Sequence, residues 1–354
     1  MTSTANSTTT YSQEFLNQET GNLLTALSAL FIALNTIFLA LRFYARSTTP
    51  RGTGWDDVFI VFSYVANIAL CIVSILIVPY GGVGLHLARV KMTNPHLLTG
   101  WAKGILAIEL IYLTAVALPK LSVLCLYLRI FTTKSSRRLA QAIIIFIAVN
   151  WAAFMVAVCF QCIPLAYWWD RTIPGGKCFN VQAFYRIMCV PNIVTDIVVM
   201  VLPIKVVVEL KLPTIKKIAL FIVFLTASFG LVASVIRFTV FFKTDAFTDR
   251  TWESVPLVGW SVVEAGMYLI AACLPLLRPI LTKHAPKWLK NKISSTFKTY
   301  SNSRSHDLQM NALNSNPNVS VAQGKQNKFS ESETKLVNGD KEIAVTIEIS
   351  QESR

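Results

Sequence analysis

The sequence predicts an all-α, polytopic membrane protein: a bundle of seven transmembrane helices with the N-terminus outside and the C-terminus in the cytoplasm. Three observations lead to this prediction. The 354 residues are 53% hydrophobic and only 15% charged, with a mean hydropathy of +0.51, which exceeds the apolar content of a typical soluble protein. Seven apolar runs are each long enough to span a bilayer. Lys and Arg concentrate in the loops on one side of these runs.

The apolar runs fit helices rather than strands. A hydrocarbon core about 30 Å thick needs roughly 20 residues of helix, at a rise of about 1.5 Å per residue. The alternating apolar and polar pattern of a membrane β-barrel is missing from the sequence, and continuous runs of this length satisfy their backbone groups only as helices. The expected helices cover residues 21–43, 57–79, 103–128, 139–163, 184–208, 218–242 and 256–281.

The distribution of basic residues sets the direction of the bundle. Short cytoplasmic loops carry an excess of Lys and Arg. The first, third and fifth loops carry this excess, whereas the other loops are longer and are partly balanced by Asp and Glu. An N-terminus on the outside follows. The basic residues of the three loops are Arg42, Arg46, Arg51, Arg129, Lys134, Arg137, Arg138, Lys205, Lys211, Lys216 and Lys217.

Two polar tails flank the predicted transmembrane domain, residues 21–282. Residues 1–20 form an extracellular tail with one sequon, so Asn6 is a candidate for N-glycosylation. Residues 283–354 form a cytoplasmic tail that starts basic and then takes a composition typical of disorder. The net charge of +14 gathers in loops and in this tail, without a stripe of interleaved aromatics, which favours the lipid bilayer over nucleic acid as a partner.

Two of the seven cysteines flank the fourth loop, which the orientation places outside. Because that compartment is oxidising, we expect a disulfide between Cys162 and Cys178. The other five cysteines lie in apolar runs, where a free thiol acts as a small hydrophobe. Cys159-Phe-Gln-Cys162 also has the spacing of a redox or zinc motif, but no second pair or nearby His completes it, so no metal is expected.

Several short motifs recur in an order that is more informative than any one of them. The series starts with Arg42-Phe-Tyr-Ala-Arg46, Gly54-Trp-Asp-Asp57 and Gly82-Val-Gly-Leu-His86. It continues with Glu109, Tyr112, Lys120, Tyr127, Arg129, Cys162-Ile-Pro164, Trp168, Cys178, Asn192, Asp196, Arg237, Glu264, Pro275 and Arg278-Pro279. Over about residues 20–285 this series resembles the fungal rhodopsin-like integral membrane family.

The resemblance implies a receptor-like seven-helix fold, and many members of the family are described as similar to G-protein-coupled receptors. A function inferred from a fold is an analogy. The third helix ends in Leu126-Tyr-Leu-Arg129, without the Asp-Arg-Tyr of the large animal receptor class. Retinal proteins hold their chromophore on a Lys of the last helix, and no Lys lies between Lys243 and Lys283. No cofactor is therefore expected.

Charged and polar residues inside the apolar runs are the candidate site. A charge near the bilayer centre costs at least about 2.5 kcal/mol on insertion scales, so each one needs a partner or a wet cavity. We expect Lys120 to pair with Asp196, and Arg237 to pair with Glu109 or Glu264. This network lines an outward-opening ligand pocket, or it is a closed set of ion pairs that fixes helix packing. Its members are Glu109, Lys120, Asn192, Asp196, Arg237 and Glu264.

Two further features have local explanations. Asp56 and Asp57 lie at the inner end of the second helix, beside the basic end of the first, so we expect surface charge pairing or N-capping. Gly81-Gly-Val-Gly84 lacks the preceding strand and following helix start of a dinucleotide site, and is expected to form a turn.

Three functions are compatible with these features. The expected one is a receptor-like sensor, in which a small or hydrophobic ligand from outside shifts the last two helices and the third and fifth loops contact a cytoplasmic signalling partner. A transporter would suit the interior charges, but no inverted repeat is visible. The third is a membrane-embedded accessory or enzyme of a fungal biosynthetic pathway. The spacing of the acidic residues does not select a reaction, so catalysis is not expected. The plasma membrane is the expected location, with internal membranes as the alternative.

Overall fold

The computed structural model describes residues 12–47, 54–130, 133–209, 214–243 and 249–284, together with the strand residues 320–321, 334–338 and 341–345. The chain forms two units, Met1–Lys283 and His284–Arg354. Asn6 lies outside the described residues, as does most of the tail that the sequence predicts to be disordered. Where that tail is described, it forms a small antiparallel sheet that the prediction of disorder does not anticipate. Its strands are β3 (Ser320–Val321), β4 (Thr334–Asn338) and β5 (Lys341–Val345).

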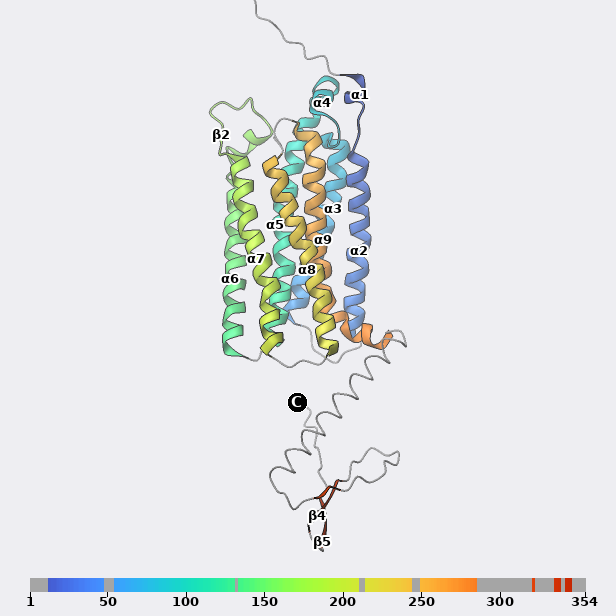
Figure 1. Cartoon of the computed structure of the whole chain (residues 1–354). Coiled ribbons are helices and arrows are strands. Elements are labelled where there is room, and N and C mark those ends of the chain that lie inside the picture. The colour runs from blue at the N-terminus through green and yellow to red at the C-terminus, as the bar shows by residue number, and fades with distance from the viewer. Residues whose placement is uncertain are drawn as a thin grey trace, which may run out of the picture. The chain divides into compact units, whose positions relative to one another are not determined.

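Six of the seven predicted apolar runs lie wholly in one long helix of the first unit, and the run 139–163 lies in a long helix except for its last residues, which confirms an all-α polytopic bundle (Figure 1). Among the described residues, six helices are long and apolar enough to cross a membrane, and α8 contributes a shorter apolar segment, Ser228–Val240. The long helices are α2 (Gly21–Ser47), α3 (Trp55–Gly81), α5 (Leu97–Ile130), α6 (Lys134–Cys159), α7 (Val181–Glu209), α8 (Thr214–Lys243) and α9 (Arg250–His284).

Several helix ends differ from the ends of the apolar runs. α5 and α9 begin about two turns before residues 103 and 256, because Trp101 and Val255 in these added turns are buried in the core. α6 ends at Cys159, before residue 163, because Cys162 is already part of a hairpin strand. Hydropathy predicts where a helix crosses the apolar layer, whereas packing decides where the helix ends.

Helix α5 lies at the centre of the packing. It packs most extensively against α3 and also contacts α6 and α7, while α2 packs on α3 and α7 packs on α8. The close approach of α3 and α5 depends on Gly100, because a Cβ at this position would overlap the carbonyl oxygen of Tyr80. The face of α5 that carries the predicted charges is therefore held in the bundle interior.

One end of the bundle carries the short elements α1 (Gln13–Leu16) and α4 (Leu87–Thr93) and a hairpin (Figure 1). The hairpin contains β1 (Cys162–Ile163), the 3-10 helix η1 (Leu165–Trp168) and β2 (Lys177–Cys178). Following the predicted orientation, we call this the outer end and the opposite one the inner end.

A turn and a histidine cluster hold the outer end together. The turn expected at Gly81–Gly84 is confirmed, and Gly82 ends α3 with a φ of 63°, a conformation that favours glycine. His86 follows this turn and lies between the rings of Phe15 and Trp252, with centroids 3.7 and 4.1 Å away. Its Nδ1 is 2.6 Å from Oδ2 of Asp249. These contacts join α1, the start of α4 and the start of α9.

At the inner end, an ion cluster joins three helices. Arg42 of α2 donates from Nη2 to Asp56 at 3.0 Å and Asp57 at 3.2 Å in α3, and from Nη1 to the carbonyl of Ala272 in α9 at 2.7 Å. Arg46 pairs with the same two carboxylates. The expected charge pairing is present, but it is not at the surface, since Arg42 is 1% exposed. The sequence could not reveal this because the carbonyl of α9 lies 230 positions further along the chain.

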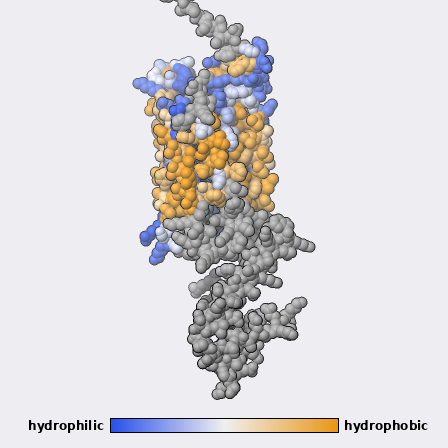
Figure 2. Space-filling view, viewed as in Figure 1, coloured by the Kyte–Doolittle hydropathy of each residue, from blue (hydrophilic) through white to orange (hydrophobic). Residues whose placement is uncertain are grey.

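The outward faces of the long helices are apolar. Figure 2 shows an orange, hydrophobic band around the middle of the described helices and blue, hydrophilic residues at the outer end. Leu30, Phe62, Phe146 and Val149 are among the large apolar side chains exposed on these faces. A band of this kind is expected where lipid replaces water as the solvent.

Candidate functional site

The candidate site lies between α5, α7, α8 and α9, each of which turns polar side chains toward the bundle interior. Residues three, four or seven positions apart share a helix face, and eleven positions are close to three full turns. The structure brings all six predicted network residues into this region, and five of them are at least nine-tenths buried. These five are Glu109, Lys120, Asp196, Arg237 and Glu264.

Lys120 and Asp196 lie in contact, with Nζ 2.5 Å from Oδ1. Lys120 also donates to the side-chain oxygen of Asn192 at 2.8 Å and to the hydroxyl of Thr195 at 3.1 Å. The ammonium lies 4.9 Å from the ring centroid of Tyr268, a distance typical of a cation–π contact. One cation on α5 is thus held by three side chains of α7 and one ring of α9.

Arg237 pairs with Glu264, and not with Glu109. Its Nε lies 3.1 Å from Oε2 of Glu264, and its guanidinium lies 4.2 Å from the ring centroid of Tyr112. The hydroxyl of Tyr112 donates to the same Oε2 at 2.9 Å. Arg237 therefore contacts a tyrosine from α5 and a carboxylate from α9 at once.

Hydroxyl and amide groups connect the two ion pairs. The hydroxyl of Ser234 lies 2.5 Å from Oε1 of Glu264 and 3.0 Å from Oδ2 of Asp196. The side-chain NH₂ of Asn192 donates to Oε1 of Glu264 at 2.7 Å, while Tyr268 donates to Asp196. The two pairs thus belong to one continuous network, which we call the charged network: Tyr112, Lys120, Asn192, Thr195, Asp196, Ser234, Arg237, Glu264 and Tyr268.

Glu109 lies apart from this network, one turn nearer the outer end than Tyr112. Its Oε2 accepts a hydrogen bond from the hydroxyl of Tyr185 at 3.1 Å. Its Oε1 is buried and has no hydrogen-bond partner. The structure thus separates Glu109 from the ion pair in which the sequence allows it to take part.

A cavity of about 90 Å³ lies between the charged network and the outer end. Glu109, Tyr112 and Arg237 form polar parts of its wall, and apolar side chains such as Ile105 and Val258 form most of the remainder. A second cavity of about 40 Å³ lies beside Lys120 and Asn192 and shares Tyr112 and Arg237 with the first. Both volumes exceed the ~10–15 Å³ that one water needs.

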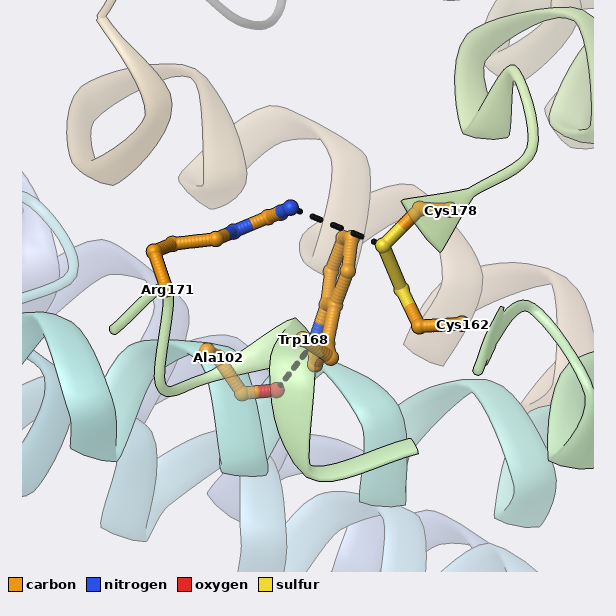
Figure 3. Close-up of a disulfide and its surroundings, with 5 residues drawn as sticks. All are labelled: Ala102, Cys162, Trp168, Arg171 and Cys178. Atoms are coloured by element: carbon orange, nitrogen blue, oxygen red, sulfur yellow. Dashed lines mark hydrogen bonds between the residues drawn. A yellow bond between two sulfur atoms is a disulfide. The ribbon is translucent and has the colours of Figure 1, made fainter. Parts of the chain in front are cut away.

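The hairpin at the outer end contributes Trp168 to the wall of the larger cavity. The disulfide between Cys162 and Cys178 is confirmed and closes this hairpin. Figure 3 shows the Trp168 ring beside the disulfide, with its Nε1 donating to the carbonyl of Ala102 in α5 at 2.9 Å. On the other side of the ring, Arg171 reaches toward Sγ of Cys178 at 3.5 Å. The disulfide thus fixes an aromatic wall residue against α5.

A local turn orders the exposed loop of the same hairpin. The side-chain hydroxyl and backbone N–H of Thr172 donate to Oδ1 of Asp170 at 2.6 and 3.0 Å. Both hydrogen bonds favour the ionised carboxylate and lower the pKa of Asp170 below its usual value.

Sequence reasoning found Asn192 but missed the other uncharged members of the site. Tyr268, Ser234 and Thr195 are common in apolar helices, so neither composition nor charge singles them out. Trp101 and Tyr185, which line the larger cavity, also carry no signal: Trp101 lies just before the apolar run 103–128, and Tyr185 lies inside the run 184–208. Tyr268 lies four positions beyond Glu264 on α9 and therefore shares its helix face. This spacing is the sequence signal that places Tyr268 in the site. Among the described residues, no group of three or more His, Cys, Asp or Glu side chains could hold a metal ion.

These features define an integral, multi-pass helical membrane protein with charged groups inside its bundle and a disulfide at one end. Residues 41–283 match the model of the fungal rhodopsin domain, and the chain belongs to this family. It is 34% identical over 274 residues, or 75% of both chains, to the polyenoic acids biosynthesis gene cluster protein Ba17b of Metarhizium anisopliae.

Two other relatives carry different descriptions. A SAT4 family membrane protein of Emericella nidulans is 25% identical over 296 residues, which are 83% of this chain and 71% of the relative. The receptor GIN3 of Arthrobotrys oligospora is 23% identical over 184 residues, which are 52% of this chain and 44% of the relative.

Proposed function

We propose that the protein is a receptor-like sensor, in which a small ligand occupies the larger cavity and changes the arrangement of α8 and α9. The observation that carries this proposal is that the cavity wall and the charged network share Tyr112 and Arg237. A ligand that moves either side chain acts directly on Glu264, which is bonded to α7 and α8 through Asn192 and Ser234. Occupancy of the cavity is thereby coupled to the positions of three helices.

We further propose that the change at Glu264 is transmitted along α9 to the inner end. Ala272 lies two turns beyond Glu264 on the same helix, and its carbonyl is held by Arg42. A rotation of α9 at Glu264 therefore changes the contact between α9 and the ion cluster. We propose a cytoplasmic partner that reads this change at the third and fifth loops, of which Lys134, Arg137 and Arg138 are exposed.

Filling the cavity tests this function. Val258 of α9 lines the cavity and is 3% exposed, so Val258→Phe is expected to occupy the space of a ligand. The matched control is Val149→Phe, at a position of α6 that is 63% exposed on the apolar outer face. The measurement is co-purification of a G-protein α subunit with the full chain from fungal membranes. Val258→Phe should change the amount captured several-fold, and Val149→Phe should not. Equal capture with both variants and the wild type would contradict the proposal.

A second candidate function comes from the relatives. Ba17b is named as a protein of a polyenoic acids biosynthesis gene cluster. On this basis the chain is a membrane-embedded accessory of a biosynthetic pathway, at the plasma membrane or an internal one. Deletion of the chain distinguishes the two: loss of a product without a signalling defect favours the accessory, and the reverse favours the sensor. Solute flux in proteoliposomes would instead favour a transporter.

We propose a non-catalytic role in either case. Asp196 and Glu264, the two acids of the charged network, are each engaged by several hydrogen-bond donors and by a cation. An acid or base held in this way is poorly placed to exchange protons with a substrate. Turnover of a pathway intermediate by the purified chain would contradict this proposal.

A further inference from the structure

Glu109 differs from the other buried carboxylates between α5, α7, α8 and α9. Asp196 and Glu264 are paired with Lys120 and Arg237, whereas Glu109 has no cationic partner among the described residues. Glu109 is only 6% exposed, and its Oε1 has no hydrogen-bond partner. A buried carboxylate with one oxygen unpaired is costly, so a group that donates to this oxygen would be bound favourably.

The surroundings of Glu109 favour a cation as that group. Glu109 lines the larger cavity together with the aromatic rings of Trp101, Tyr112, Trp168 and Tyr185. The faces of such rings attract ammonium groups, most strongly when the site is desolvated. A carboxylate surrounded by aromatic rings is thus complementary to a positive charge and offers little to an anion.

Arg237 in the same wall does not reverse this preference. Its charge is balanced by Glu264 at 3.1 Å, and its guanidinium lies against the ring of Tyr112 at 4.2 Å. Glu109 is therefore the group of the described cavity wall whose formal charge is unbalanced. A ligand that brings one positive charge to Glu109 makes the wall and the ligand together neutral.

We propose that the larger cavity binds a small ligand that presents a protonated primary amine to Oε1 of Glu109. The apolar body of the ligand lies against Ile105, Ile108 and Val258. The volume of about 90 Å³ is smaller than the ~150 Å³ of an apolar cavity that holds benzene, so the enclosed part is a short aliphatic chain. This inference rests on the proposed function, because it names the class of ligand that the sensor recognises.

Three probes of equal length and different charge test the inference: butylamine, butan-1-ol and butyrate. Each is titrated near neutral pH into the full chain in lipid nanodiscs, with binding followed by calorimetry and corrected for partition into empty nanodiscs. Butylamine should bind at least about tenfold more tightly than butan-1-ol, because its ammonium makes a charge-assisted hydrogen bond with Glu109. Butyrate should bind most weakly.

Two variants that each replace one carboxylate by an amide test the role of Glu109. Glu109→Gln should remove the advantage of the amine and leave binding of the alcohol within about twofold, since the amide keeps the size of the side chain. Asp170→Asn removes a carboxylate from the exposed hairpin loop at the same end and should leave all three affinities unchanged. The comparison of the three probes on the wild-type chain remains decisive if Glu109→Gln fails to fold.

Three results would overturn the inference. They are equal binding of amine and alcohol, tighter binding of butyrate, and no measurable binding of butylamine to the wild-type chain. Each of these can occur while Val258→Phe still changes capture of the signalling partner, in which case the sensor function stands with a different ligand. Loss of the capture effect with intact amine binding would instead remove the signalling role and keep the site.

Discussion

At the scale of single residues, the charged network depends on pairs that are desolvated together. Replacing a buried ion pair by apolar groups is often tolerated, whereas removing one partner leaves an uncompensated charge. Lys120 belongs to such a buried pair. Its ammonium lies within 3.1 Å of side-chain oxygens of Asp196, Asn192 and Thr195. Replacing one partner of a pair is therefore expected to destabilise the protein, and replacing both partners is expected to cost less than the sum of the two single losses.

Lys120 and Asp196 are expected to be energetically coupled. Lys120→Ala and Asp196→Ala should each lower the free energy of unfolding by about 3–5 kcal/mol, and the double variant should recover part of this loss. The measurement is folded yield and thermal midpoint in detergent for the three variants and the wild type. Additive losses in the double variant would show that the two side chains are not coupled.

A comparison of yield with signalling separates packing from binding. If the double variant recovers yield and loses activity, the pair balances charge and also serves the site. If the double variant is fully active, the pair of Lys120 and Asp196 has no part in sensing.

Only part of the residue-level site follows from the sequence. Lys120 and Asp196 have opposite sign and similar depth, and the structure places them in contact. The sequence does not decide between Glu109 and Glu264 as the partner of Arg237, because spacing along a helix gives the face of a residue but not the rotation of one helix against another. The hydroxyl groups of Tyr112, Ser234 and Tyr268 complete the network, and uncharged groups give no signal in an apolar run.

At the scale of elements, α9 is held at both of its ends. Its first turn carries Trp252, which stacks on His86 at the outer end. Near the inner end, the carbonyl of Ala272 accepts from Arg42. This carbonyl lies in the turn before Pro275, whose missing N–H weakens the helical hydrogen bonds of that turn. The carbonyl that Pro275 leaves without its helical donor is that of Ala271, so Arg42 bonds α9 one residue beyond this position.

The second prediction separates the two arginines of the inner cluster. Arg42→Met should lower the free energy of unfolding by about 3 kcal/mol or more, because it leaves two buried carboxylates with a single cation and removes the bond to the carbonyl of Ala272. The measurement is the thermal midpoint of the purified chain. Arg46→Met should cost less, since the side chain of Arg46 is 11% exposed whereas that of Arg42 is 1% exposed. Equal losses from the two substitutions would contradict a special role of the contact with α9.

Hydropathy predicts the elements themselves well, because the bilayer imposes both length and helical form. Each of the seven runs corresponds to one long helix, with only the end of the run 139–163 outside it, and the turn at Gly81–Gly84 and the disulfide are also as expected. The elements at the outer end are less predictable. The stacking of His86 between Phe15 and Trp252 depends on residues from three distant segments, none of which carries a periodic pattern.

At the scale of the whole molecule, the direction in the membrane remains a prediction from the basic loops. Met92 is 68% exposed in α4 at the outer end, and Ser135 is exposed at the start of α6 at the inner end. Met92→Cys should react with a membrane-impermeant maleimide added to intact cells, and Ser135→Cys should react only after the membrane is opened. The wild-type chain, with its exposed Cys159, is the background for both. The reverse labelling pattern would show that the bundle has the opposite orientation, with its N-terminus in the cytoplasm.

The charged network also has a consequence for how the chain is made. α5 brings Glu109 and Lys120 to the membrane before α7, α8 and α9 exist. Asn192 follows Lys120 by 72 residues, and Glu264 follows Asn192 by another 72, which at ~5–20 residues per second corresponds to delays on the order of ten seconds. During translation, Lys120 of α5 is therefore made several seconds before its partner Asp196 of α7. The charged network is complete only when α9, which carries Glu264 and Tyr268, has also been synthesised.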